Sequence, residues 1–279
     1  MSYVREPAVS GTFYPGDPKA LKRDIDRYLD NAMFDAVAGD IVGIISPHAG
    51  FIYSGPVAAY GYRALQGSSY DTVVVIAPSH RVYFEGAAIQ DKGGYKMPLG
   101  TIAIDEEIAG GLMRESRDVT SDARPHAMEH SLEVQLPFLQ VVLKPFKLVP
   151  LVIGVQDVPT CERLADAICG VVQASGKKVL IVGSTDLSHY HPYSQAVKLD
   201  SVLVDDLEKY DVKGLKEDFN RNRFEACGFG PIVITMLASK ALGATESKVL
   251  KYMNSGDTSG DKSGVVGYVS SVFYRSSGA

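Results

Sequence analysis

Three short apolar runs, each ended by turn-forming residues, constrain most strongly what this chain can fold into. They cover residues 41–45, 72–77 and 178–183. Runs of this length that are rich in valine and isoleucine are typical of strands buried on both faces. Because helical patterns lie between them, the runs predict a mainly parallel central sheet covered by helices.

The remaining periodicity predicts the other elements. Helices are expected from residue 18 and at 56–66, 105–115, 157–174, 194–209 and 228–242. Residues 125–143 are expected to be mostly helical, with Pro137 as a kink or break. Besides a strand at 148–153, glycine-punctuated and β-like stretches predict a hairpin or meander at 86–105 and strands at 248–253 and 265–273. These stretches favour mixed pairing. No linker, repeat or low-complexity tract divides the chain, so we predict an α/β fold in a single domain of residues 1–279.

Composition and charge argue against several classes of protein. The net charge of −5 is spread along the chain without runs of like charge, so a basic face for nucleic acid is not expected. No apolar stretch approaches the roughly 20 residues that span a bilayer, and the N-terminus lacks the pattern of a signal peptide. The 3 cysteines form no spaced pairs, so we expect a cytoplasmic protein without disulfides.

Side chains suited to chemistry follow the three apolar runs. His48 follows the first run, His80 the second, and Asp186 and His189 the third. The carboxyl ends of parallel strands meet at one edge of a sheet, where ligands and catalytic groups collect. A single histidine in such a place is more often structural, but the repetition favours a site. His48 and His80 are therefore predicted to converge on one metal ion.

Cys227 is the third candidate ligand. It lies in the segment EACGFGP, where two glycines and a proline predict the start of a helix. The helix dipole and the free N–H groups there favour a thiolate, so we expect a lowered pKa for this thiol. The alternative is a buried structural cysteine, which carries about equal weight. Cys161 and Cys169 lie in an amphipathic helical pattern and are expected to be ordinary core or surface residues.

Asp186 and His189 offer acid–base chemistry. They are three residues apart, so on a turn or helix start both side chains can lie on one side. The carboxylate would then orient the imidazole ring and favour its charged form. In the alternative interpretation, Asp186 caps the following turn and His189 is exposed.

A second pair of histidines lies on the helix predicted at 125–143. His126 and His130 are four residues apart, but Glu129 precedes the second histidine instead of following the first. The zinc-protease motif HExxH is therefore absent. Glu129, His130 and Glu133 are predicted either to line the pocket or to form a solvated helix face.

Several segments, taken in order, resemble the Memo family. They are PAVSGTFYP, SPHAGFIYSG, APSH, EHSLEVQLPFL, GSTDLSHY, ACGFGP and SGVVGY, and they run from residue 7 to about residue 269. The resemblance implies a fold like that of the class III, non-haem iron extradiol dioxygenases. It also implies that His48, His80 and Cys227 bind a metal, with Asp186 and His189 lining the same pocket.

A cysteine ligand would set this chain apart from those dioxygenases, which hold ferrous iron with two histidines and a carboxylate. A thiolate favours softer metals such as copper or zinc, whereas the resemblance to the dioxygenases implies iron. Iron or copper is the expected cofactor, with zinc as an alternative. We expect a metal-binding protein with redox or oxygen-linked chemistry.

The sequence is also compatible with two other functions. One is a metal-independent enzyme with Cys227 as nucleophile, His189 as base and Asp186 as orienting group. The other is a module whose pocket binds a small molecule or a peptide. The resemblance implies phosphopeptide binding by a eukaryotic member of the family.

Overall fold

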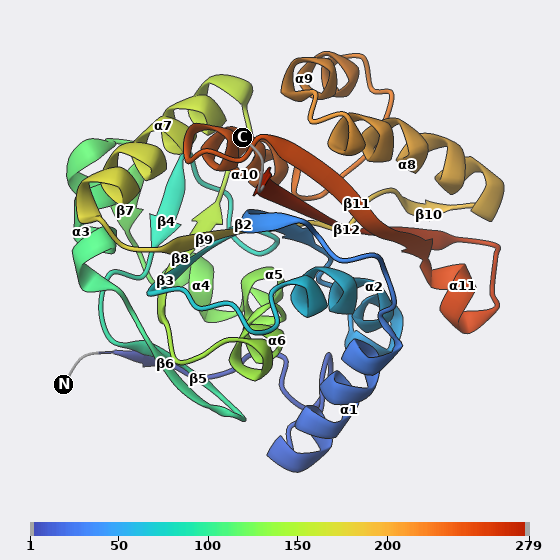
Figure 1. Cartoon of the computed structure of the whole chain (residues 1–279), viewed down its shortest axis with the longest axis horizontal. Coiled ribbons are helices and arrows are strands. Elements are labelled where there is room, and N and C mark those ends of the chain that lie inside the picture. The colour runs from blue at the N-terminus through green and yellow to red at the C-terminus, as the bar shows by residue number, and fades with distance from the viewer. Residues whose placement is uncertain (1–2, 277–279) are drawn as a thin grey trace.

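The computed structural model describes residues 3–276, which form a large sheet covered by helices and a small sheet beside it (Figure 1). The strands are β1 (Val4–Arg5), β2 (Gly39–Ser46), β3 (Thr72–Pro78), β4 (Ala87–Ile89), β5 (Gly94–Met97), β6 (Gly100–Ala103), β7 (Val119–Ser121), β8 (Lys147–Ile153), β9 (Val179–Ser184), β10 (His189–His191), β11 (Glu246–Asn254) and β12 (Val265–Ser276). The helices are α1 (Pro18–Asn31), α2 (Phe51–Ala64), α3 (Glu106–Glu115), α4 (Arg124–Ala127), α5 (His130–Glu133), α6 (Leu136–Val142), α7 (Val158–Ser175), α8 (Tyr193–Glu208), α9 (Val212–Asn220), α10 (Phe229–Ala241) and α11 (Ser255–Ser259).

The nine-stranded sheet has a parallel centre and antiparallel neighbours. Its order is β10-β12-β2-β9-β3-β8-β4-β7, and β11 pairs with β12 outside this path. Strands β2, β9, β3 and β8 are parallel, whereas β12 and β4 join this group in the antiparallel sense. The three apolar runs are the central strands β2, β3 and β9. The predicted α/β fold, with a mixed central sheet flanked by helices, is confirmed.

The register of the central strands sets the position of the candidate site. Ser46 at the end of β2 lies opposite Ser184 of β9, and Ile76 of β3 lies opposite Gly183. The carboxyl ends of β2, β9 and β3 therefore lie at the same edge of the sheet. Whatever follows each strand is brought together there.

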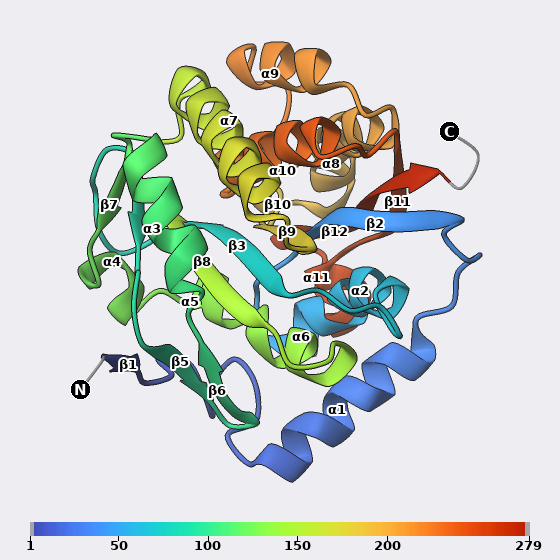
Figure 2. The ribbon, with the colours of Figure 1, turned by 60° about the vertical axis from the view of Figure 1, so that its left-hand side comes forward.

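Helices cover both faces of the sheet, with α3, α7 and α10 on one face and α1, α2, α5 and α6 on the other (Figures 1 and 2). Helix α10 approaches the strands closely because glycines face it. A Cβ atom on Gly43 would lie 2.1 Å from Ser239 Oγ, and one on Gly183 would lie 2.5 Å from Thr235 Oγ1. This close packing places the beginning of α10, and Cys227 before it, beside the ends of β2 and β9.

Several predicted elements differ from the structure. The segment 125–143 is mostly helical, as predicted, but it forms the three short helices α4, α5 and α6, and its interruptions lie before His130 and before Leu136 instead of at Pro137. The Glu129 side chain accepts a hydrogen bond from the Ser131 N–H and so begins a new helix, and Pro137 lies in the first turn of α6, where a proline is tolerated. The helix predicted at 56–66 begins earlier, at Phe51, and includes Pro56.

The polar connection between α8 and α10 contains a helix that the sequence pattern did not predict. This helix, α9, is capped by Asp211, whose carboxylate accepts from the Gly214 N–H. Within residues 3–276, no helix is both long enough and apolar enough to cross a membrane.

Candidate metal centre

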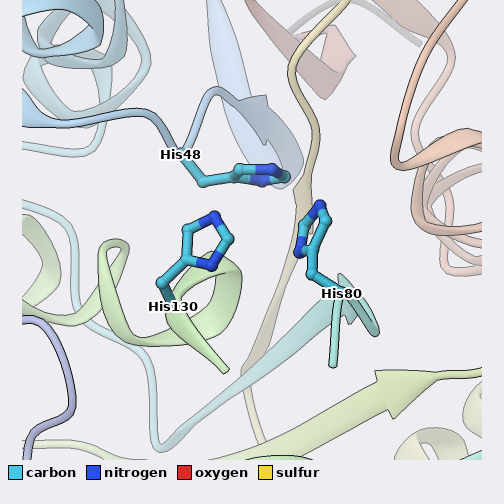
Figure 3. A group of neighbouring side chains, drawn as sticks. All are labelled: His48, His80 and His130. Atoms are coloured by element: carbon cyan, nitrogen blue, oxygen red, sulfur yellow. The ribbon is translucent and has the colours of Figure 1, made fainter. Parts of the chain in front are cut away.

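The candidate site lies where the central strands end. His48 follows β2, His80 follows β3, and the segment from Asp186 to His189 follows β9. His130, the first residue of α5, reaches the same place from the helical layer (Figure 3). The prediction that His48 and His80 meet at this edge of the sheet is confirmed, because their ring centroids are 5.2 Å apart.

Three imidazole rings face a common centre (Figure 3). His48, His80 and His130 each offer one nitrogen atom, and these atoms all lie within 4.8 Å of one another. The His130 ring centroid lies 5.5 Å from that of His48 and 4.7 Å from that of His80. His130 thus belongs to the cluster itself, whereas the sequence placed it only in the wall of the pocket. This three-histidine cluster is the one grouping of metal-ligand type found among the described residues.

The hydrogen bonds behind His48 determine its tautomer. Its Nδ1 lies 2.8 Å from Ser184 Oγ, and that hydroxyl donates its proton to the Ser131 carbonyl at 2.7 Å. A hydroxyl has one proton, so Ser184 must accept from His48 Nδ1–H. Nε2 therefore keeps its lone pair and is the nitrogen available to a metal. The His48 N–H also donates to Asp186 Oδ1 at 2.8 Å, which fixes the main chain of the loop.

Glu129 orients the other two histidines. Its carboxylate accepts from the His80 N–H at 2.6 Å and lies 2.9 Å from His80 Nδ1. The oxygen near His80 Nδ1 is Oε1. This oxygen also lies 3.3 Å from His130 Nδ1 and accepts hydrogen bonds from the N–H and the hydroxyl of Ser131. Carboxylates that hold the second nitrogen of a ligating histidine are a common feature of metal sites, because they fix the ring and raise its basicity. Glu129 was predicted to be a pocket residue, and this is its role there.

The protonation states suit metal binding. Burial is the main cause that lowers the pKa of His48 well below its usual value and that of His130 to about 4, and the charge of His80 lowers both further. Both rings are therefore neutral near pH 7, as a ligand must be. Burial raises the pKa of Glu129, but hydrogen bonds and charge from His80 outweigh it and leave a pKa of about 2.

Cys227 lies beside the cluster, next to His48. Its Sγ is 3.2 Å from His48 Nε2, and it accepts from the Asp186 N–H at 3.3 Å. The predicted lowering of its pKa is wrong for this arrangement. Burial raises the pKa of the Cys227 thiol, and the charge of Asp186 raises it further.

The beginning of α10 explains why this thiol gains nothing from the helix. The Gly228 N–H donates to Thr185 Oγ1 at 3.0 Å, and the Gly230 N–H donates to Gln156 Oε1 at 2.7 Å. These side chains, and not the sulfur of Cys227, satisfy two of the first N–H groups of the helix. The sulfur lies just outside the cap and faces Asp186 instead.

Asp186 and His189 both border the cluster, but they do not form the expected pair. Asp186 is almost fully buried and accepts from the main-chain N–H of His48, and burial raises its pKa to about 7. Burial also lowers the pKa of His189, so Asp186 does not favour the charged ring as predicted. No hydrogen bond joins the two side chains in the described part of the chain.

The other candidates lie away from the cluster. His126 faces the core, where it accepts from the Tyr95 hydroxyl at 2.6 Å through Nδ1 and donates to the Ala88 carbonyl at 3.1 Å. Cys161 and Cys169 are buried in α7, and burial raises their pKa values to about 12 and about 11. They are core residues, as predicted.

Sequence reasoning did not find Ser184, whose hydroxyl orients His48. It also left Glu133 as a pocket or surface residue, whereas the structure buries Glu133 fully in an ion pair with Arg5. A hydroxyl at the end of a buried strand and a glutamate in an apolar helical stretch were the available signals. Neither signal identifies its partner, because each partner is distant in sequence.

Comparison with known proteins agrees with the segments identified in the sequence. Residues 5–272 match the sequence model of the Memo-like protein family. A MEMO1 family protein of Methanopyrus kandleri is 38% identical over 280 residues, covering 97% of this chain and 99% of the relative. One from Methanothermobacter thermautotrophicus is 37% identical, covering 95% and 98%, and one from Sulfolobus acidocaldarius is 38% identical, covering 96% and 98%. The chain therefore belongs to the Memo-like protein family.

Proposed function

We propose that this protein binds one transition-metal ion with His48, His80 and His130. The observation that carries the proposal is the arrangement of their rings, which present nitrogens within 4.8 Å of one another. Ser184 holds the opposite nitrogen of His48, and Glu129 faces the opposite nitrogens of the other two rings. Ligating histidines in metal sites show this same support on the second nitrogen.

The donor set limits the choice of metal. Neutral imidazoles suit iron, copper, zinc and nickel, and a hard cation such as magnesium would require oxygen ligands. Cys227 Sγ lies near the metal-facing nitrogen of His48, and we propose it as a fourth ligand once the thiol loses its proton. A thiolate beside three imidazoles favours iron or copper over harder ions, with zinc as the alternative. A bound iron or copper ion would supply redox or oxygen-linked chemistry.

Two residues beside the cluster are suited to proton transfer. The Asp186 carboxyl, with a pKa of about 7, is able to hold or release a proton near neutral pH. The lowered pKa of His189 leaves its ring neutral and able to accept a proton. These groups would serve a ligand that exchanges a proton while it occupies the centre.

The proposed ligand is a small molecule or a peptide with an apolar part. Exposed apolar side chains lie beside the site residues in the sequence: Ile52, Tyr53, Val82, Tyr83, Met128 and Tyr190. Exposed aromatic and aliphatic residues are enriched at binding surfaces. A phosphopeptide is the ligand that the family resemblance suggests.

Metal analysis of protein purified without a histidine tag tests the proposal. The chain is loaded with ferrous or cuprous ion without oxygen, freed of unbound metal and analysed by mass spectrometry, with one ion per chain as the expected result. Alanine variants of His48, His80 and His130 should lose the metal. His191→Ala, which removes an imidazole that pairs with Glu225 outside the cluster, should keep it.

The same experiment separates the two candidate ligand sets. With the three-histidine set, His130→Ala loses the ion and Cys227→Ala binds it more weakly. If Cys227→Ala abolishes binding and His130→Ala leaves it unchanged, His48, His80 and Cys227 form the site and the assignment of His130 is wrong. If the wild-type chain holds no metal after loading, the proposed function is wrong.

A second candidate function rests on the 3.2 Å contact between Cys227 Sγ and His48 Nε2. A cysteine beside a histidine base is the arrangement of a metal-independent nucleophilic enzyme. In this interpretation His48, and not His189, would be the base. A metal-free protein whose Cys227 is alkylated much faster than Cys161 and Cys169 at pH 7 would favour the enzyme, whereas slow alkylation favours the metal centre.

A further inference from the structure

The segment of residues 5–14, which we call the N-terminal strap, runs from β1 towards α1 and contacts the site from behind. Arg5 begins it and is a buried arginine with 1% of its surface exposed. Its guanidinium donates to Glu133 Oε2 at 2.6 Å, to the His126 carbonyl at 2.7 Å and to the Glu129 carbonyl at 2.8 Å. One side chain thus connects α4, α5 and Glu129, which lies between them.

Glu133 binds the strap through hydrogen bonds to its carboxylate. Its carboxylate is fully buried, and every hydrogen bond that it accepts among the described residues comes from the strap. Besides Arg5, the donors are the Ala8 N–H at 2.7 Å, the Val9 N–H at 3.0 Å and the Tyr14 hydroxyl at 2.5 Å. A buried carboxylate without such partners would be strongly unfavourable, so the strap and α5 must fold together.

The strap contacts His130 directly and is linked to the other two histidines through intervening residues. Arg5 holds the main chain of Glu129, whose carboxylate faces His80 and His130. The Phe13 ring lies 5.0 Å from the His130 ring, centroid to centroid. The Phe13 carbonyl accepts from the Phe51 N–H at 2.8 Å, three residues after His48.

Helices α4 and α5 need this support. Each has four residues. Helices this short do not hold their conformation without tertiary contacts, because one turn gains too few hydrogen bonds to offset the ordering of the chain. Arg5 bonds the carbonyls of His126 and Glu129, on either side of the break between α4 and α5. The position of His130 at the start of α5 therefore depends on the strap.

We propose that the N-terminal strap is part of the metal centre, with Arg5 and Phe13 as positioning residues for Glu129 and His130. The inference rests on the proposed metal-binding function. It assigns a role to the segment PAVSGTFYP, which contains none of the candidate ligands. The strap sets the affinity and the release rate of the ion without touching it.

Cobalt binding tests this inference. Co²⁺ serves as the probe, because its visible absorption reports the geometry of its ligands. Arg5→Lys keeps the charge beside Glu133 but loses the forked contact to two carbonyls, and Phe13→Ala removes the ring beside His130. We expect each variant to bind Co²⁺ roughly 10- to 100-fold more weakly, to release it faster to a chelator and to change the absorption band. Phe13→Tyr should restore the wild-type values.

The control is Val172→Ala, a buried substitution in α7 away from the site. Stability in urea is measured for all variants, so that effects on the centre are compared at a similar loss of stability. The control should keep its Co²⁺ affinity and absorption band. If the strap variants also keep both, the strap is only structural and the inference is wrong.

Failure of the proposed function gives a different result. If the wild-type chain binds no Co²⁺, iron or copper, the metal assignment is wrong, whatever the strap does. The ring nitrogen chemical shifts of His80 and His130 in the metal-free protein then decide the strap inference. Shifts that change in Arg5→Lys and Phe13→Ala but not in Val172→Ala support positioning, and unchanged shifts overturn it.

Discussion

Replacing Glu129 by glutamine tests how far the metal centre depends on the charge behind it. Glutamine keeps the length of the side chain but exchanges one acceptor oxygen for an NH₂ group that only donates. In the wild type, both carboxylate oxygens accept: one from the His80 N–H at 2.6 Å, the other from Ser131 and from His80 Nδ1. In Glu129→Gln at least one donor therefore faces another donor.

The magnitude follows from the pKa of Glu129, which falls from 4.5 to about 2 in the folded protein. One pKa unit corresponds to about 1.4 kcal/mol, so the charged carboxylate contributes roughly 3 kcal/mol to the free energy of unfolding. Because the folded-state pKa is the lower one, this contribution is complete above the unfolded pKa and is lost as the pH falls towards 2. Glu129→Gln should therefore lower the stability of the metal-free protein at pH 7 by up to that amount.

Urea unfolding of the metal-free protein and metal titration measure the two consequences. We expect Glu129→Gln to unfold at lower urea at pH 7, to lose less stability than the wild type between pH 5 and pH 3, and to bind metal roughly 10- to 100-fold more weakly. Glu115→Gln, on the exposed surface of α3, is the matched control and should change none of these values. If Glu129→Gln matches the wild type in stability at pH 7 and in metal affinity, Glu129 does not support the centre.

Three other predictions follow from individual residues. Burial lowers the pKa of His126 from 6.5 to about 4, so the unfolded chain takes up a proton at a higher pH than the folded protein does. About 3 kcal/mol of the free energy of unfolding should therefore be lost as the pH falls from 6.5 to 4. Urea unfolding should show that His126→Gln removes this loss. Because the pKa of Cys227 is raised, its alkylation in the metal-free protein should accelerate with pH up to pH 9, and a plateau below pH 8 would contradict the burial argument. Tyr190 has a φ of 63°, which asparagine adopts more readily than tyrosine, and its side chain is 79% exposed. Tyr190→Asn should therefore relieve backbone strain and raise the free energy of unfolding by about 1 kcal/mol. A loss of stability would show that the tyrosine ring makes a necessary contact.

The strands of the site could be predicted from the sequence because their signal is local. A strand buried on both faces must be apolar throughout, and the residue after it must begin a turn. These two conditions identified β2, β3 and β9 and the side chains His48, His80 and Asp186 that follow them. Because the strands are parallel, the meeting of their carboxyl ends could be predicted without knowing any contact between side chains.

The helical part of the site could not be predicted in the same way. The pattern of residues 125–143 is apolar at helical spacing, and Pro137 predicts an interruption, but nothing in the pattern places the two interruptions where the structure has them, before His130 and before Leu136. The break depends on Arg5 and Glu129, which satisfy main-chain groups at the interruptions. Without the break, His130 would continue a helix, and its place in the cluster would be lost.

Cys227 shows the limit of arguments from a local motif. A cysteine before a glycine-rich helix start has access to free N–H groups in general, and this favours a thiolate. Here Thr185 and Gln156 reach those N–H groups first, and Asp186 presents its charge to the sulfur. Burial of the sulfur, which is the main cause, and the charge of Asp186 thus raise the pKa of the thiol instead of lowering it.

The candidate ligands and the residues that orient them depend on contacts at different distances along the chain. His48 and His80 directly follow the strands β2 and β3, so their positions are a consequence of local structure, whereas His130 begins α5 and depends on contacts from distant residues. The groups behind the ligands join distant segments: Ser184 connects to His48 across 136 residues, and Arg5 connects to Glu133 across 128. A buried charge or polar group without a hydrogen-bond partner is costly, so these long connections form when the whole fold closes. If the centre holds a metal as proposed, its affinity should depend on the contacts of the N-terminal strap as well as on the ligands.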